Sequence, residues 1–337
     1  MRRTLLPLAL ALTIPPAATA AGPFFLRGGE RVVFLGDSIT FAGDYIAVID
    51  AYLFARFPDK SFELINLGLP SETVTGLTET DHPFPRPDVH DRLARALEKT
   101  RPGVVVACYG MNDGIYHPFG ADRFRKYQQG IEKLIEKVKQ SGARLVLMTP
   151  PPFDPVPVRD RLAPGKAKDF GYKRPYRDYD EVLARYAAWL LTLRDRGIPV
   201  VDLHTPLNEH LAGKRKTDPK YTLAPDGVHP NAAGHRRIAR ELLRAWHAPD
   251  ADAALTLPER QPKLWELAAE RQRLLGRAWL DHVGHTRPQT PKGLPLAEAK
   301  ERAAGLERQI RELVTPPKKQ QPPAADRGNG RGQSRGS

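Results

Sequence analysis

Residues 31–43 read RVVFLGDSITFAG, and the change of pattern within this stretch decides the fold. The first six residues are mostly β-branched, aromatic or aliphatic and end at Gly36, which predicts a short buried strand. From Phe41 onward the pattern is that of a helix. Ser38 lies at this junction, where a serine either stabilises the turn and caps the helix or acts as a nucleophile.

The same alternation of strand and helix continues along the chain. Strands are expected at 31–36, 62–67, 103–109, 144–149 and 198–203, and helices at 43–57, 88–99, 121–140, 178–196 and after Pro230. Apolar strands that alternate with helices are typical of a parallel sheet with helices on both faces. The sequence therefore predicts one doubly wound α/β domain over residues 22–248.

The first 21 residues have the pattern of a secretory signal peptide. Arg2 and Arg3 precede the apolar run 5–14, and Ala18 and Ala20 have the A-x-A spacing of a cleavage site. The run is shorter than the ~20 residues of a membrane-spanning helix, and no later segment is long and apolar enough to span. We expect a secreted or periplasmic protein without a transmembrane segment.

The composition limits the kinds of molecule that the chain is expected to bind. The 337 residues carry a formal net charge of +13, but part of this surplus lies in the predicted signal peptide and near the C-terminus. No nucleic-acid-binding motif accompanies it, so no nucleic-acid partner is expected; anionic glycans, lipid surfaces or solubility would each account for the charge. Cys108 is the only cysteine, which excludes an internal disulfide and favours a small buried apolar role.

Two segments interrupt or follow the α/β pattern. The proline-rich, basic stretch 150–175 follows the fourth strand, at the edge where open α/β sheets bind ligands, and is either a substrate-shaping loop or a surface excursion. Helices at 258–282 and 296–313 predict a helical C-terminal extension, 249–314, that docks on the main domain or on a second copy. The Pro, Gln, Gly and Arg bias of 315–337 predicts a disordered basic tail.

A nucleophilic serine needs a base and a group that orients the base. The stretch APDGVHPNAAGH, 224–235, contains Asp226 and His229 three residues apart, after the fifth strand and before a helix. This spacing can place the carboxylate beside the imidazole and leave the other ring nitrogen for Ser38. The alternative is structural: Asp226 would stabilise a turn and His229 would cap the helix.

Acyl transfer also needs hydrogen-bond donors for the oxygen that becomes negative in the transition state. Three candidates follow the first three strands: the backbone N–H of Ser38, the backbone N–H of Gly68, and the side-chain amide of Asn112. Each alone would be an ordinary turn residue. Together with the serine, aspartate and histidine they complete a hydrolytic site.

Four segments in this order, GDSIT, NLG, GMND and DGVHP, resemble the sequence blocks of the SGNH hydrolases, also called the GDSL esterase/lipase family. The resemblance covers about residues 31–247. It implies a three-layer α/β/α fold with a flavodoxin-like five-stranded parallel sheet and a serine hydrolase that acts on esters. By matching position, Ser38 would be the nucleophile and first oxyanion donor, Gly68 and Asn112 the other donors, and His229 and Asp226 the base and its orienting acid.

Family members often have a second glycine three residues after the glycine of block two, where this chain has Ser71. This departure puts the shape of the nearby loop in question. Outside the blocks, Asp281, His282 and His285 in WLDHVGHTRP are interpreted as polar surface or docking residues, because two histidines without further ligands seldom form a metal site. We expect neither a metal nor an organic cofactor.

The sequence thus predicts an exported carboxylic-ester hydrolase that works through an acyl-serine intermediate. The first expectation for its substrate is a small acyl group such as acetyl on a carbohydrate. Lysophospholipids and aryl esters are the enzymatic alternatives. A catalytically silent glycan-binding domain that keeps the fold is the alternative from another class.

Overall fold

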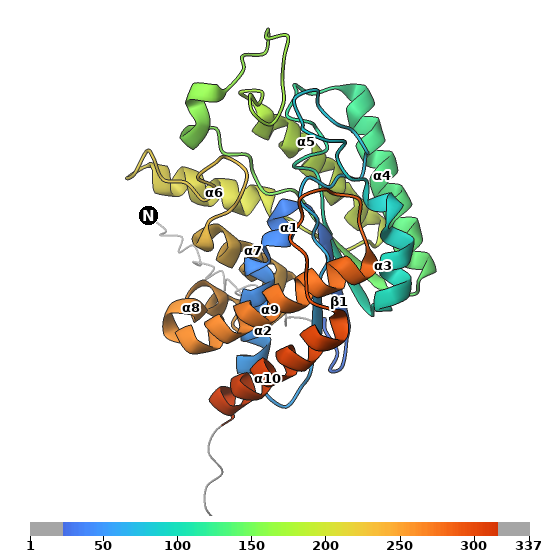
Figure 1. Cartoon of the computed structure of the whole chain (residues 1–337). Helices are drawn as coiled ribbons and strands as arrows, with labels where there is room; N and C mark the ends of the chain where they lie inside the picture. The colour runs from blue at the N-terminus through green and yellow to red at the C-terminus, as the bar shows by residue number, and fades with distance from the viewer. Residues whose placement is uncertain (1–22, 316–337) are drawn as a thin grey trace, which may run out of the picture.

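A computed structural model describes residues 23–315 and shows a parallel β-sheet between two layers of helices (Figure 1). The five strands are β1 (Arg31–Gly36), β2 (Glu63–Asn66), β3 (Val104–Cys108), β4 (Arg144–Met148) and β5 (Val200–Val201). Their order, β2-β1-β3-β4-β5, is that of flavodoxin-like sheets. The predicted three-layer α/β/α class is confirmed.

β1 occupies the interior of the sheet, between β2 and β3. Phe34 of β1 lies opposite Asn66 of β2 and Val106 of β3. Five of the six β1 residues are buried, because helices cover both faces of the sheet and leave no solvated side. Since all strands are parallel, the segments that follow β1, β2 and β3 begin at the same edge, and Ser38, Gly68 and Asn112 lie on these segments.

Helices connect the strands and form the outer layers. Their bounds are α1 (Ser38–Ala42), α2 (Asp44–Arg56), α3 (Leu93–Thr100), α4 (Ala121–Gln140), α5 (Tyr179–Thr192), α6 (His204–Arg215) and α7 (Ala232–Ala245). α2 and α7 pack together on one face of the sheet, and α3, α4 and α5 lie on the other (Figure 1). α6 was not predicted, because only three of its residues are buried and a proline lies in its first turn.

The C-terminal extension is α-helical and docks on the sheet domain. It consists of α8 (Leu257–Arg260), α9 (Pro262–Val283) and α10 (Leu296–Val314). α9 contacts α2 and β2, and α10 packs against α9 (Figure 1). Leu264, Leu267, Leu275, Trp279 and Leu280 of α9 are buried. α2 has ten buried residues out of 13, and a helix that is apolar nearly all round requires cover on its outer side.

A buried ion pair also joins the extension to α2. The Asp50 carboxylate, 1% exposed as a residue, accepts hydrogen bonds from Arg271 Nη1 and Gln272 Nε2 of α9, each at 2.8 Å. An aspartate at this depth is stable as an anion only with such partners. The extension is therefore part of the folded body.

Truncation after Pro249 is expected to remove a large share of the stability. The loss of Arg271 from a buried pair costs about 3–5 kcal/mol by itself, and the exposed apolar surface of α2 adds to it. Since 1 kcal/mol shifts Tm by about 2–4 °C in a domain of this size, we expect a fall of at least ~10 °C or loss of soluble protein. Deletion of 316–337 alone is the control and should leave Tm unchanged. An unchanged Tm, solubility and oligomeric state after the larger truncation would contradict the docking.

The predicted signal peptide, 1–21, and nearly all of the predicted basic tail, 315–337, lie outside the described residues. Within residues 23–315, no helix combines the length and the apolar character needed to cross a bilayer.

Candidate active site

Ser38 is the first residue of α1 and follows β1 by two residues. Asp37 caps this short helix, since its Oδ1 accepts the Ile39 N–H at 2.9 Å. Gly36 permits the sharp turn: a Cβ on this residue would lie 2.3 Å from Thr40 Oγ1 and 2.9 Å from the Cys108 carbonyl oxygen. The strand-turn-helix junction therefore presents the Ser38 hydroxyl at the carboxyl edge of the sheet.

Asp226 and His229 lie in one turn between β5 and α7. Asp226 Oδ1 accepts the backbone N–H groups of Val228 at 2.9 Å and His229 at 2.7 Å, which is the geometry of a turn closed by an aspartate side chain. The second oxygen, Oδ2, lies 2.6 Å from His229 Nδ1. One carboxylate thus shapes the turn and holds the imidazole.

The structure brings Ser38 to this pair. His229 Nε2 lies 2.8 Å from Ser38 Oγ, although the two residues are 191 positions apart in the sequence. The three side chains form a continuous hydrogen-bonded chain from carboxylate to imidazole to hydroxyl. Such a chain can withdraw the hydroxyl proton while the carboxylate stabilises the imidazolium that results.

The electrostatics of the pair favour this proton transfer. Burial lowers the pKa of His229, but the hydrogen bond and the charge of Asp226 outweigh burial and raise the pKa above its usual value. Burial also opposes ionisation of Asp226, yet the His229 side-chain and backbone hydrogen bonds hold its pKa below the usual range. Asp226 is therefore ionised at neutral pH and increases the basicity of His229.

The segment after β4 braces the turn that carries Asp226 and His229. The Asp154 N–H donates to the Gly227 carbonyl at 2.8 Å, and Arg161 Nη2 donates to the Asp226 carbonyl at 2.7 Å. The Asp154 carboxylate is itself held by Arg215 at 2.6 Å. Part of the 150–175 stretch thus contacts the site directly.

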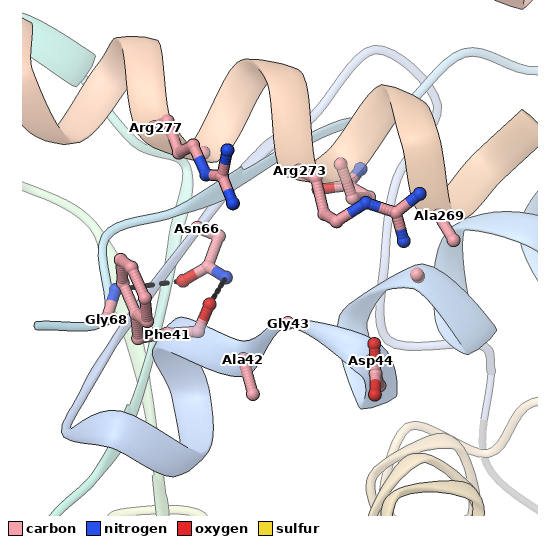
Figure 2. Close-up of a pocket in the computed structure, with 12 residues that line it drawn as sticks. Phe41, Ala42, Gly43, Asp44, Asn66, Gly68, Ala269, Arg273 and Arg277 are labelled. Atoms are coloured by element: carbon pink, nitrogen blue, oxygen red, sulfur yellow. Dashed lines mark hydrogen bonds between the residues drawn. The ribbon is translucent and has the colours of Figure 1, made fainter. Parts of the chain in front are cut away.

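Gly68 does not have the expected geometry of an oxyanion donor. Its N–H donates to Asn66 Oδ1 at 2.8 Å (Figure 2). The Asn66 Nδ2 donates in turn to the Thr40 carbonyl at 2.7 Å. A Cβ at position 68 would lie 2.2 Å from the Phe41 nitrogen. The need for glycine here is therefore explained by the close packing of this segment against α1, and its N–H is already in use.

Ser71, where the sequence departs from the usual glycine, lies in a turn beside the Ser38 segment. Leu69 N–H donates to the Gly36 carbonyl at 2.8 Å, so the segment after β2 runs beside the segment that leads to Ser38. Ser71 has a φ of 69° and follows Pro70, and Glu72 N–H closes the turn on the Leu69 carbonyl at 3.1 Å. Proline followed by a left-handed residue is typical of a type II turn, which explains why a glycine is common there. Among residues 23–315, the Ser71 N–H donates no backbone hydrogen bond.

Asn112 is held at both ends of its amide. Its Oδ1 accepts the Tyr116 hydroxyl at 3.1 Å, and its Nδ2 donates to the Glu72 carbonyl at 3.3 Å. The carbonyl of Glu72 can only accept, so the NH₂ group must face it. An NH₂ group has two protons, and the second N–H of Asn112 is left for another acceptor.

Two further carboxylates are buried next to the site residues. Burial raises the pKa of Asp37 to about 6, against the opposing effects of the Ile39 N–H and the charge on His229. Burial likewise raises the pKa of Asp113 to about 7, although the Val74 N–H donates to its Oδ1 at 2.8 Å. Asp37 and Asp113 shape backbone turns and do not contact the Ser38 hydroxyl.

The segment 279–288 contacts α3 through its backbone. Two basic side chains of α3 donate hydrogen bonds to its carbonyls. Lys99 Nζ donates to the His282 carbonyl at 2.6 Å, and Arg95 Nε donates to the Val283 carbonyl at 3.3 Å. His285 Nε2 lies 3.8 Å from Asp281 Oδ1. Across the part of the chain that the structure describes, no group of three potential ligands could hold a metal ion.

A pocket of about 190 Å³ lies between α9 and the α1–α2 junction. Figure 2 shows Arg273 and Arg277 of α9 above it and Phe41, Gly43, Asp44 and Gly68 along its other side. Its lining includes neither Ser38, Asp226 nor His229. This pocket is therefore distinct from the hydrogen-bonded chain at Ser38.

Comparison with known proteins identifies relatives of the chain. Residues 34–237 match the model of the GDSL-like lipase/acylhydrolase family. An acetylxylan esterase of Geobacillus stearothermophilus is 26% identical over 240 residues, which are 65% of this chain and 94% of the esterase.

Two solved structures are among those similar to the chain. A catalytic variant of an acetylxylan esterase from that organism is 24% identical, with 66% of this chain and 96% of the esterase covered at a TM-score of 0.49. A gut microbial diltiazem-metabolizing enzyme is 23% identical, also with a TM-score of 0.49; the match covers 66% of this chain but only 47% of that enzyme.

Proposed function

Because the chain belongs to the GDSL-like lipase/acylhydrolase family and is a carboxylic-ester hydrolase, we propose that Ser38 is its nucleophile, His229 its general base and Asp226 the acid that orients the base. The observation that carries this proposal is the continuous chain of contacts, 2.6 Å from Asp226 Oδ2 to His229 Nδ1 and 2.8 Å from His229 Nε2 to Ser38 Oγ.

The reaction proceeds in two halves. His229 accepts the Ser38 proton while Oγ attacks the ester carbonyl carbon, and the tetrahedral intermediate collapses as His229 protonates the departing alkoxide. The alcohol leaves and an acyl-serine ester remains. Water, deprotonated by His229, then attacks the acyl carbon, and the carboxylic acid is released as the proton returns to Ser38.

Three donors stabilise the negative oxygen of each tetrahedral intermediate: the Ser38 N–H, the Ser71 N–H and the free N–H of Asn112 Nδ2. Ser71 replaces Gly68 in this role because the Gly68 N–H is bonded to Asn66, whereas Ser71 has the left-handed turn geometry beside the Ser38 segment. Donors held in place before the reaction require no reorganisation as charge develops.

The proposed substrate is an acetyl ester on a carbohydrate. A relative that is 26% identical is an acetylxylan esterase. The His229 and Asp226 side chains are 50% and 51% exposed, which suits an ester carried on a bulky polymer. Beside Ser71, the rings of His82, Phe84 and Tyr172 form a partly exposed cluster, and aromatic linings with few placed polar groups are typical of small-ligand sites.

A substrate panel tests this specificity. Acetylated xylooligosaccharides, 4-nitrophenyl acetate, 4-nitrophenyl octanoate and a lysophospholipid would be compared by kcat/KM. We expect the acetyl esters to be cleaved fastest and the acetylated oligosaccharide to have the lower KM of the two. Faster cleavage of the octanoate or the lysophospholipid would contradict the carbohydrate assignment while leaving the triad intact.

We also propose that the enzyme works outside the cytoplasm, supported by the signal-peptide pattern of residues 1–21. N-terminal sequencing of the mature protein from fractionated cells tests this. Cleavage after Ala20 or Ala21 in an exported fraction is expected, and an intact N-terminus in the cytoplasm would contradict it.

The activity should depend on pH through His229, which must be neutral to accept the Ser38 proton. Its raised pKa in the folded protein predicts that kcat/KM falls as pH decreases, with a midpoint above the unperturbed value of about 6.5. In Asp226→Asn the hydrogen bond to Asp226 as an anion and the charge of Asp226, the two largest effects that raise this pKa, are lost, while burial and the smaller effect of Asp37 remain, so the midpoint should move to lower pH. An unmoved midpoint in this variant would assign the titration to another group.

A further inference from the structure

Glu72 connects two of the proposed oxyanion donors. It directly follows Ser71, and its own carbonyl accepts Asn112 Nδ2 at 3.3 Å. The position of this one residue therefore affects both the Ser71 N–H and the Asn112 amide. Hydrogen-bond donors must lie about 2.7–3.1 Å from the developing oxyanion, so small displacements of Glu72 matter for catalysis.

The Glu72 side chain is anchored by a buried ion pair. Arg92 donates to Glu72 through Nε and Nη2, both at 2.6 Å, and the Tyr109 hydroxyl donates to Glu72 Oε2 at 2.7 Å. The side chains of Arg92 and Glu72 are 2% and 0% exposed. Bidentate arginine–carboxylate pairs fix direction as well as distance, so this carboxylate has one available position.

Arg92 extends the anchor to the segment before the turn. Its Nη2 also donates to the Leu67 carbonyl at 2.7 Å. The guanidinium thus contacts the chain on both sides of the turn that contains Ser71. A second buried arginine, Arg86, donates from Nη1 to the Ser71 carbonyl at 3.3 Å and is paired with Glu79.

We infer that the buried Glu72–Arg92 pair is a positioning device for the oxyanion hole: it sets the distance between the Ser71 N–H and the Asn112 amide through the backbone of Glu72. This inference rests on the proposed function, since it assigns a role to residues that never touch the substrate. A buried ion pair is weak evidence of added stability by itself, because the desolvation of both charges offsets their attraction. The pair is instead explained by its effect on the site, because Glu72 directly follows Ser71 and its carbonyl accepts Asn112 Nδ2.

The test uses Arg92→Lys, which keeps the charge but loses the bidentate geometry, and Tyr109→Phe, which removes one hydrogen bond to Glu72 without changing a charge. If Arg92→Lys does not fold, Tyr109→Phe still tests the inference. We expect kcat for an acetyl ester to fall about tenfold or more in Arg92→Lys and by a smaller factor in Tyr109→Phe. KM should stay within about twofold of the parental value in both variants. The expected losses are smaller than the roughly 100-fold or more that follows from complete loss of a donor, because the donors are displaced and not removed.

Matched controls separate positioning from loss of stability. Arg271→Lys alters a buried arginine–carboxylate pair between α9 and α2, and Tyr52→Phe removes a hydroxyl that donates to the Pro249 carbonyl. Both should lower Tm and leave kcat unchanged. If these controls lower kcat to the same extent, the effect at Arg92 is one of general stability and the inference fails.

A double-mutant cycle with Asn112→Ala gives the decisive comparison. If the pair acts through Asn112, Arg92→Lys or Tyr109→Phe should have a smaller effect on kcat in the Asn112→Ala background than in the parent. Independent, fully additive losses would overturn the inference. An Asn112→Ala enzyme with parental kcat would instead contradict the proposed oxyanion hole, so the two failures are distinguishable.

Discussion

Ser38→Ala is expected to lower kcat/KM for an acetyl ester by about 10⁴-fold or more, and His229→Ala by a similar factor, because triad members act as one unit. The distances from Ser38 Oγ to His229 Nε2 and from His229 Nδ1 to Asp226 carry this expectation. Since the losses are not independent, the double variant should be little slower than either single variant.

The folded state of these variants provides the control. His229 is half exposed, and the Ser38 hydroxyl contributes no bond to the core, so the Tm of each should remain near the parental value. If either variant hydrolysed the ester at near the parental rate, in a preparation free of contaminating esterase, the assignment of Ser38 and His229 to a catalytic triad would be wrong.

Asn112→Ala is expected to lower kcat by about two orders of magnitude while KM changes much less, because its amide is proposed to bind the oxygen only as that oxygen becomes negative. The rigid placement of the amide between Tyr116 and Glu72 is the basis for a large effect. Asn208→Ala is a suitable control, since Asn208 Nδ2 donates to Asp180 Oδ2 at 3.0 Å and has no contact with the proposed donors.

A change confined to KM in Asn112→Ala would make Asn112 a substrate-binding residue. An unchanged kcat and KM would contradict the proposed oxyanion hole, in which Asn112 is one of three donors.

The strands and most of the helices between them were predictable because that information is local and periodic, whereas the flavodoxin-like arrangement of the sheet was implied by the resemblance to the SGNH hydrolases. Each strand is a short apolar run bounded by turn residues, and β1 illustrates this with five buried residues before a glycine that the turn requires. α6 escaped prediction because its burial is sparse: only His204, Leu207 and Leu211 face the interior.

The candidate site was predictable where function depends on side-chain chemistry. Ser38, Asp226 and His229 were identified from residue type, spacing and their place after strands, and the structure brings these three together. The backbone donor was harder to identify, because any residue has an N–H. Gly68 is a candidate because it follows the second strand, but its N–H is bonded to Asn66, its lack of a Cβ serves its packing against α1, and the left-handed turn lies at Ser71. The Pro70–Ser71 pair was the available signal for that turn.

The buried pairs that hold the site could not be predicted from the sequence. Glu72 and Arg92 are 20 residues apart in a segment that is mostly irregular, and Asp50 and Arg271 are 221 residues apart. Charged residues are usually exposed, so neither residue type nor spacing marks these four as buried. Their pairing is a consequence of tertiary structure.

The most direct test of the central claim is to identify the residue that a fluorophosphonate ester labels in active enzyme. The label reacts with an activated serine, and tryptic cleavage should release residues 32–56, in which Ser38 is the only serine. We predict one adduct per chain, on Ser38 within this peptide, that forms as esterase activity is lost and is absent in His229→Ala. Complete inactivation with the label on another residue, or full acetyl-ester hydrolysis by a chain labelled on Ser38, would contradict the assignment of Ser38 as the nucleophile.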